Sequence, residues 1–150
     1  MSIAMPTGTR ERFLAEPRVG VLGVTDPRGR RAPLLVPLWF DYQPGGEVVL
    51  HTGRNTIKAQ LVRAAGRFSL CVQDETPPYR YVSVEGPVTA VEEALNPALR
   101  SAIAHRYLDA ETATAYLETT KEQLAEDVAF RMRPEHWRTA DFSTFATSFS

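Results

Sequence analysis

The amino-acid sequence predicts a mainly β fold: an antiparallel barrel of six or seven strands, with helices capping its openings. Successive strand-like segments are joined by short turns rich in Gly and Pro, which favour antiparallel pairing. One of these segments, residues 33–42, is apolar on both faces, as expected of a strand that is covered on each side. A barrel is the simplest closure that pairs all such strands.

The length and composition predict one domain over residues 1–150. A net charge of -1 argues against a strongly nucleic-acid-binding or membrane-surface protein. The start of the chain lacks a signal-peptide pattern and no apolar run is long enough to span a bilayer, so we expect a cytoplasmic protein. A single cysteine, Cys71, excludes an intrachain disulfide, and three scattered histidines give no metal site.

The N-terminal third predicts a helix followed by a hairpin. Residues 7–16 have a short amphipathic pattern that Pro17 ends. Residues 19–25 form the first strand, whose two glycines indicate that something large packs close to it. Residues 26–29 are a strong turn signal, and the strand at 33–42 returns from it, with Pro37 marking an edge or a bulge.

The middle of the chain predicts three strands around a helix. A third strand, 47–52, precedes a helix at 59–65, and residues 67–73 alternate as a fourth strand. After a loop at 74–78, the long β-rich segment 79–91 is expected to bend at Gly86–Pro87, so that it serves two parts of the barrel.

The C-terminal third predicts two helices and two closing strands. Asn96 caps the first helix with Pro97 at its first position, and a second helix covers residues 110–124. Residues 127–132 and 137–142 form the closing strands. The polar and aromatic tail, 143–150, is expected to be flexible or to cover a neighbour.

The turn between the third strand and the central helix has the composition of a phosphate-binding site. Thr52, Asn55 and Thr56 are small polar residues, and Arg54 and Lys58 add two cations beside them. The chain has fifteen arginines and two lysines, so a lysine is an unusual choice at this place. The same residues also fit a plain turn and helix cap.

Four segments in this order resemble the split-barrel proteins of the pyridoxamine-phosphate-oxidase-like family, which are flavin- and deazaflavin-dependent oxidoreductases. They are residues 19–30, 36–40, 51–61 with 67–70, and 77–86. Each motif is weak alone, but their joint order and spacing make the resemblance specific. The common Ser-x-Lys of the family's phosphate turn is Thr56-Ile57-Lys58 here, which keeps the hydroxyl.

The resemblance implies a split barrel with a cofactor phosphate held by Thr52, Arg54, Thr56 and Lys58. It also implies that residues 37–40 lie along the flavin or deazaflavin ring, that Gln73 and Asp74 lie near the ring edge, and that the protein is a homodimer with cofactor sites at its interface. Trp137 is expected to reach the partner's site. The candidate cofactor-binding residues are Pro37, Leu38, Trp39, Phe40, His51, Thr52, Arg54, Asn55, Thr56, Lys58, Gln73, Asp74, Tyr79 and Trp137.

The resemblance further implies hydride transfer from reduced coenzyme F420, a deazaflavin, to a small conjugated substrate. The Trp39–Phe40 pair and the 77–86 segment favour the deazaflavin branch. Alternatives are an FMN-binding flavin reductase, a pyridoxamine-phosphate oxidase, a non-catalytic module that sequesters a cofactor, and a purely structural barrel. The oxidase is disfavoured because no second cluster for a substrate phosphate is evident. We find no catalytic triad and no Rossmann motif, as expected where the cofactor does the chemistry.

Overall fold

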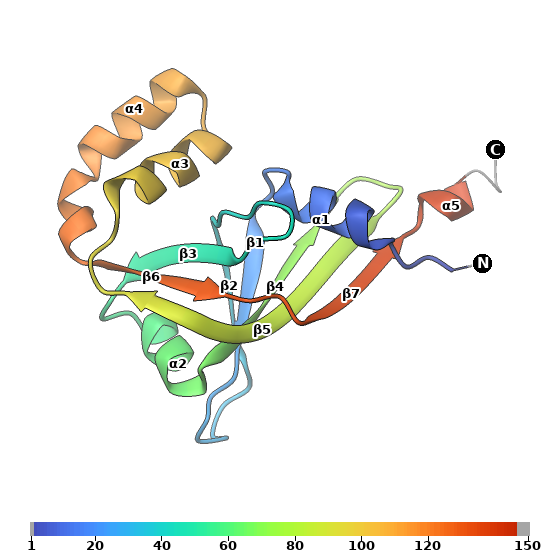
Figure 1. Cartoon of the computed structure of the whole chain (residues 1–150), viewed down its shortest axis with the longest axis horizontal. Helices are drawn as coiled ribbons and strands as arrows, with labels where there is room; N and C mark the ends of the chain where they lie inside the picture. The colour runs from blue at the N-terminus through green and yellow to red at the C-terminus, as the bar shows by residue number, and fades with distance from the viewer. Residues whose placement is uncertain (1, 147–150) are drawn as a thin grey trace.

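The structure, a computed structural model, describes residues 2–146. Its strands form one curled antiparallel seven-stranded sheet in the order β2-β1-β4-β5-β6-β3, with β7 paired to β5 (Figure 1). This confirms the mainly β, half-barrel fold that the sequence predicts. The strands are β1 (Gly20–Val24), β2 (Leu34–Leu38), β3 (Val48–Gly53), β4 (Arg67–Gln73), β5 (Arg80–Glu92), β6 (Asp127–Met132) and β7 (His136–Asp141).

The helices flank this sheet. They are α1 (Thr7–Ala15), α2 (Ile57–Ala65), α3 (Pro97–Tyr107), α4 (Ala110–Thr119), the 3₁₀ helix η1 (Lys121–Ala125) and the short α5 (Ser143–Ala146). The α3–α4 pair projects from one end of the barrel, and α2 lies on the opposite side of β6 from it (Figure 1). None of the described helices is long and apolar enough to cross a membrane.

Two helices and the tail differ in their boundaries from the sequence prediction. Helix α2 begins two residues before the expected start because the Thr56 hydroxyl accepts a hydrogen bond from the Ala59 amide. The helix expected over 110–124 ends at Thr119, and η1 continues the chain. The first four residues of the expected tail form α5, and the remainder, 147–150, lies outside the described residues.

Strand β5 serves two parts of the barrel, as predicted. Its first half pairs with β4 on one side and β7 on the other, and its second half pairs with β6 after a register shift between Val88 and Ala90. Gly86 lies two residues before this shift. A Cβ atom there would be 1.7 Å from the carbonyl oxygen of Arg133, so only glycine allows the chains to approach this closely.

Within one protomer, β2 does not have the cover on both faces that the sequence predicts. Its inward residues pack against the core, but Leu35 points outward and is 68% exposed, so the strand is covered on one face only. β2 is an edge strand, and this position agrees with the presence of Pro37. The close packing expected at the two glycines of β1 is confirmed at Gly20, where a Cβ atom would lie 2.7 Å from a Leu70 methyl group, but not at Gly23, where nothing would be closer than 3.5 Å.

Candidate functional site

The turn from β3 to α2 is built around Thr56. Its hydroxyl donates to the Gly53 carbonyl oxygen at 2.8 Å and accepts from the Ala59 amide at 3.2 Å. Thr56 is therefore the N-cap of α2, and its hydroxyl is already engaged. Asn55 at the tip of the turn is exposed. The sequence predicted a turn and a capped helix here, with Thr56 as one of three capping candidates.

Arg54 holds the turn in place. Its guanidinium donates to the carbonyl oxygens of Ala125 at 3.0 Å and Glu93 at 2.9 Å, and its own amide donates to the Glu126 carbonyl oxygen. These bonds fasten the turn to the end of η1 and to the chain that follows β5. Arg54 thus has a structural task that its sequence position did not reveal, because its partners lie far away in the chain.

Lys58 is the cation of this turn that remains available. Among residues 2–146, no hydrogen-bond or ion-pair partner faces its ammonium group, and the backbone amides of Ile57 and Lys58 also have no acceptor. The hydroxyl of Thr52, a residue only 6% exposed, is likewise without a partner in the described part of the chain. Free amides at a helix N-terminus beside a cation are suited to binding an anionic phosphate.

A pocket of about 610 Å³ runs along α2 beside this turn. Apolar side chains from α2 and from the β1–β2 hairpin form most of its wall, and three charged residues stand at its hairpin end. It is lined by Asp26, Arg28, Arg31, Ala32, Pro33, Leu34, Leu35, Ile57, Gln60 and Leu61. Helix α2 also packs against β1 and β4. The pocket is lined both by Ile57 at the start of α2 and by Leu34 and Leu35, so it connects the phosphate turn with the first residues of β2.

Asp26 shapes the hairpin end of this pocket. Its carboxylate accepts from the backbone amide of Arg28 at 3.0 Å, two residues along, in an Asx-type turn. This backbone hydrogen bond lowers the pKa of Asp26 below its usual value, against an opposing effect of burial. The pocket rim therefore carries a carboxylate as well as the cations of Arg28 and Arg31.

The four candidate ring neighbours after the hairpin face in different directions. Pro37 is exposed on the outer face, and Leu38 packs inward against the core. Trp39 stacks on Tyr107 of α3, with ring centroids 5.1 Å apart and planes 8° from parallel. Phe40 is fully buried in the core, so its side chain is unable to meet a ligand.

His51 has a partner that sequence analysis missed. Its Nδ1 atom lies 2.8 Å from Oδ2 of Asp127, at the start of β6. The pairing of His51 with Ala129 and of Gly53 with Asp127 in the β3–β6 register makes the two residues diagonal neighbours. The two residues are 76 positions apart in the chain, and only the pairing register of β3 and β6 reveals their contact. The sequence does not give this register.

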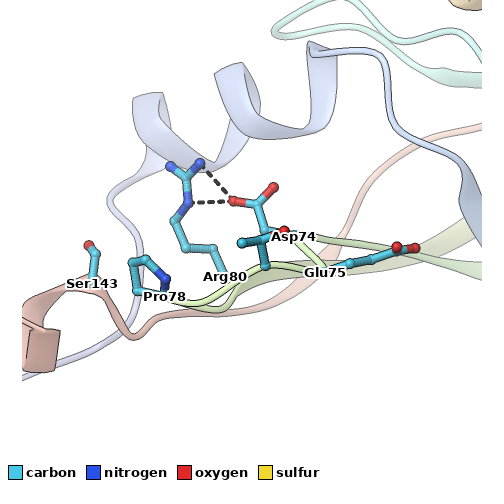
Figure 2. A pocket seen from close by; sticks show the side chains of 6 residues that line it. Asp74, Glu75, Pro78, Arg80 and Ser143 are labelled. Carbon is cyan, nitrogen blue, oxygen red and sulfur yellow. Dashed lines mark hydrogen bonds and ion pairs between the residues drawn. The ribbon is translucent and has the colours of Figure 1, made fainter.

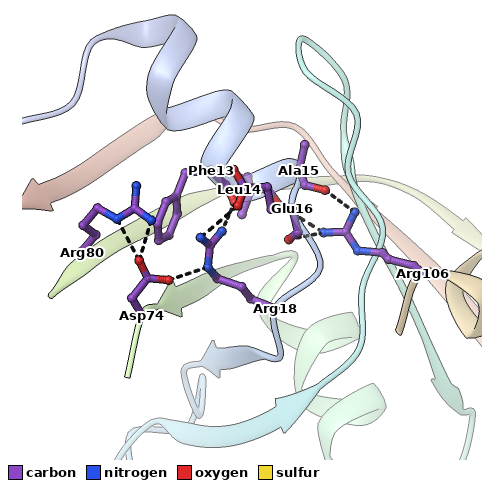
Figure 3. A network of polar contacts seen from close by, with 8 residues as sticks. All are labelled: Phe13, Leu14, Ala15, Glu16, Arg18, Asp74, Arg80 and Arg106. Atoms are coloured by element: carbon purple, nitrogen blue, oxygen red, sulfur yellow. Dashed lines mark hydrogen bonds and ion pairs between the residues drawn. The ribbon is translucent and has the colours of Figure 1, made fainter. Parts of the chain in front are cut away.

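Asp74 lies in a network of charged side chains at the end of β4 and also lines a pocket of about 310 Å³, together with Glu75, Pro78 and Ser143 (Figure 2). It accepts from Nε of Arg18 at 2.9 Å and from Nε of Arg80 at 2.8 Å (Figure 3). Burial raises the pKa of Asp74, but the hydrogen bonds from Arg80 and Arg18 outweigh burial and leave it lowered. Gln73 and Tyr79 are exposed nearby.

The same network clamps the C-terminal end of α1 (Figure 3). Arg18 donates to the Phe13 carbonyl oxygen at 2.7 Å, and Arg106 of α3 donates to the carbonyl oxygens of Ala15 at 2.6 Å and Leu14 at 3.1 Å. Arginine side chains thus satisfy the carbonyl groups that a helix end leaves free.

Trp137 lies on β7, at the sheet edge away from β2. The guanidinium of Arg10 covers its ring at 4.5 Å from the centroid, and Tyr42 meets it edge-on. Within one protomer, the structure therefore gathers the turn residues 51–58 and the start of β2, but not Gln73, Asp74, Tyr79 or Trp137. No group of three or more His, Cys, Asp or Glu residues in the described part of the chain is placed to hold a metal ion.

Comparison with known proteins identifies the family of this chain. A family model described as pyridoxamine 5'-phosphate oxidase matches residues 6–139. Comparison with curated proteins finds no match. Among solved structures, an F420 reductase has 20% identity and a TM-score of 0.61, over 85% of this chain and 94% of that one. A conserved hypothetical protein from Mycobacterium tuberculosis has 23% identity and a TM-score of 0.71, over 97% and 90%.

An FAD-binding protein from Mesorhizobium loti is similar at 19% identity and a TM-score of 0.60, over 91% of this chain and 94% of that one. At such identities these structures show a shared fold. The family model, by contrast, spans most of the chain, from α1 into β7. The chain therefore belongs to the pyridoxamine 5'-phosphate oxidase family, as the order and spacing of its motifs indicate.

Proposed function

We propose that this protein is an oxidoreductase that binds the deazaflavin coenzyme F420 and transfers hydride to a small conjugated organic molecule. The observation that carries the proposal is the unpaired ammonium group of Lys58 beside two free backbone amides at the start of α2. These groups would hold the cofactor phosphate, and the unpaired hydroxyl of the buried Thr52 fits the same role.

The apolar pocket along α2 would hold the ring of the cofactor. It extends from Ile57, the neighbour of Lys58, to Leu35 on the exposed face of β2. Pro37 is two residues further along the strand, which corresponds to about 7 Å. A flat ring that lies along β2 would therefore remain within reach of a phosphate bound at Lys58.

We also propose that the protein is a homodimer that completes this site. The outer face of β2 and β1 carries Leu35, which is 68% exposed, Val21, which is 37% exposed, and Pro37. An apolar sheet face of this kind is typical of an interaction surface. A second copy that covers it would bury these side chains and shield the ring from water, with Trp137 of the partner subunit at its edge.

When bound, the deazaflavin supplies the hydride chemistry, and the protein supplies binding, orientation and exclusion of water. Lys58 and the α2 amides neutralise and fix the phosphate end. The apolar residues Leu35, Ile57 and Leu61 remove water from the space beside β2. Arg54, through its bonds to Ala125 and Glu93, keeps the turn in the shape that this binding needs.

Fluorescence titration of cofactor-stripped protein with F420 and with FMN tests the proposal. We expect tight binding of F420 and weak binding of FMN. The reverse result would assign the protein to FMN and to flavin reductase or related chemistry. Tight F420 binding without reduction of any acceptor in a broad panel would indicate a sequestering module, and binding of neither cofactor would overturn the assignment of the turn.

A further inference from the structure

The outer face of β2 ends at Trp39. Phe40 and Tyr42 are both buried in the core, so the inward and outward alternation of β2 continues past the last residue of the strand. Trp39 therefore lies on the same outer face as Leu35 and Pro37, about 13 Å along the chain from Leu35. The pocket beside the phosphate turn reaches Leu35, so Trp39 is at the opposite end of this row.

Two tyrosines of the α3–α4 pair hold the Trp39 ring. Tyr107 of α3 stacks on it in parallel, and Tyr116 of α4 meets it at 56°, with ring centroids 5.4 Å apart. All three side chains are half-buried. Trp39, Tyr107 and Tyr116 are called the aromatic corner below. Stacked and tilted pairs of this kind are favourable, so the Trp39 ring has a defined orientation before any ligand binds.

Tyr107 supports the aromatic corner from within the fold. Its hydroxyl donates to the carbonyl oxygen of Arg18 at 2.8 Å and accepts from the Phe40 amide at 3.3 Å. Arg18 lies just before β1 and Phe40 just after β2, so this hydroxyl joins the two strands where their pairing ends. The Tyr107 hydroxyl is therefore engaged, and its ring serves as a backing for Trp39.

The other two members of the aromatic corner have free donors. Within residues 2–146, neither the indole N–H of Trp39 nor the hydroxyl of Tyr116 has a hydrogen-bond partner. Trp and Tyr combine an apolar ring with one polar group that usually binds a partner. A stacking surface with two free donors is suited to a planar ligand that carries an oxygen acceptor.

An exposed apolar side chain extends the aromatic corner. Gly20 of β1 is paired with Leu38 of β2, and continuing this register by one residue places Val19 opposite Trp39. Val19 is 53% exposed. The surface next to the corner is thus apolar, as the binding of an uncharged ring requires.

We propose that the aromatic corner binds the hydride acceptor, and that this acceptor is a planar conjugated molecule with a carbonyl oxygen, such as an aryl-substituted enone. The inference rests on the proposed function, because a cofactor ring along β2 would bring the hydride to this end of the strand. Trp39 stacks on the ring of the acceptor, and Trp39 and Tyr116 donate to its oxygen. The reaction adds a hydride from reduced F420 and a proton from water across the C=C bond, and yields the saturated ketone and oxidised F420.

Two enones that differ in one substituent test the proposal. 4-Phenylbut-3-en-2-one carries an aromatic ring where pent-3-en-2-one carries a methyl group. The first measurement is binding to the full-length protein, with and without F420, followed by the NMR signal of the Trp39 indole N–H. That signal is the one absent from Trp39→Leu. We expect a saturable shift with the phenyl enone and binding at least about tenfold weaker with the methyl enone.

The second measurement is the preference for the phenyl enone, expressed as the ratio of the kcat/KM values for the two enones. Trp39→Leu and Tyr116→Leu should each lower this ratio by about two- to tenfold, because each removes an aromatic contact. Tyr116→Phe keeps the ring and loses the hydroxyl, so it should lower kcat/KM for both enones by about two- to tenfold and preserve the ratio. Phe142→Leu, which removes an exposed aromatic ring outside the corner, should behave as wild type.

Titration with F420 separates this inference from the proposed function. Tyr116→Leu should bind F420 as wild type does, and a large loss of F420 affinity would assign the corner to the cofactor and overturn the inference. F420 binding without an indole shift from either enone, or with an unchanged ratio in both leucine variants, also overturns it and leaves the cofactor assignment intact. A shift with the phenyl enone in a protein that binds no F420 would support the corner as a ring-binding site and reject the cofactor.

Discussion

The Nε atom of Arg18 donates a hydrogen bond to the carboxylate of Asp74 at 2.9 Å and so joins the chain after α1 to the end of β4. Arg80 binds the other carboxylate oxygen at 2.8 Å. Both guanidinium groups lie over the ring of Phe13, at 3.6 Å and 5.0 Å from its centroid. Because Asp74 holds two cations over an aromatic ring, its first role is to fix α1 on the barrel.

Replacing Asp74 with Asn should therefore destabilise the fold. One carboxylate would be lost between two partly buried guanidinium groups, at a cost of about 2 kcal/mol in the free energy of unfolding. Urea unfolding followed by circular dichroism measures this change. Glu75→Gln, an exposed neighbour, is the matched control and should unfold as wild type.

The same ion pairs predict a pH dependence. The pKa of Asp74 is lower in the folded state, so its contribution to stability is present above the unfolded carboxyl pKa of about 3.9 and is lost as the pH falls below it. Asp74→Asn should therefore flatten the decline of stability in this acidic range. An identical decline in wild type and variant would show that other carboxyl groups cause it.

Gly86→Ala tests the bend of β5. The added methyl group would meet the Arg133 carbonyl oxygen, which is backbone and unable to turn aside. We expect a loss of about 3 kcal/mol or more in the free energy of unfolding, as for severe overpacking. Gly23→Ala is the control, because its Cβ would meet nothing closer than 3.5 Å and should cost far less. Equal stability of the two variants would contradict the role given to Gly86.

Val21→Glu tests the proposed dimer. Val21 is 37% exposed on the outer face of β1, and a charge there would have to be buried beneath a second copy. Light scattering should show a dimeric wild type and a largely monomeric variant. Val91→Glu is the matched control, since Val91 is 39% exposed on the distal half of β5. A monomeric wild-type protein would reject the interface.

The sequence predicts those structural features that depend on residues close together in the chain. The strands, a small polar cap for α2, the two-part role of β5 and the edge position of Pro37 follow from neighbouring residues, and each is present in the structure. Contacts between distant segments are different. The bonds of Arg54 to Ala125 and Glu93, and the His51–Asp127 pair, depend on strand register and loop path. Local patterns carry no information about these.

The two cations of the phosphate turn differ in this respect, because Arg54 has distant partners and Lys58 has none among the described residues. Arg54→Gln should lower the free energy of unfolding by about 1–3 kcal/mol, because two carbonyl oxygens lose a charged donor. Lys58→Ala should leave the stability within about 0.5 kcal/mol of wild type, because no described residue pairs with its ammonium group. Its effect should instead appear in cofactor binding, as a loss of about 1.5–3 kcal/mol, or about 10- to 100-fold in Kd.

Unfolding curves and cofactor titrations on the same two variants provide the decisive comparison. Lys58→Arg keeps the positive charge and should retain much of the affinity that Lys58→Ala loses, as expected if the side chain binds an anion. If Lys58→Ala bound cofactor as wild type does, the phosphate would have to be held by the free amides of α2 alone. If it lost stability instead, the ammonium group would be part of the fold, and the turn would contain two structural cations and no ligand site.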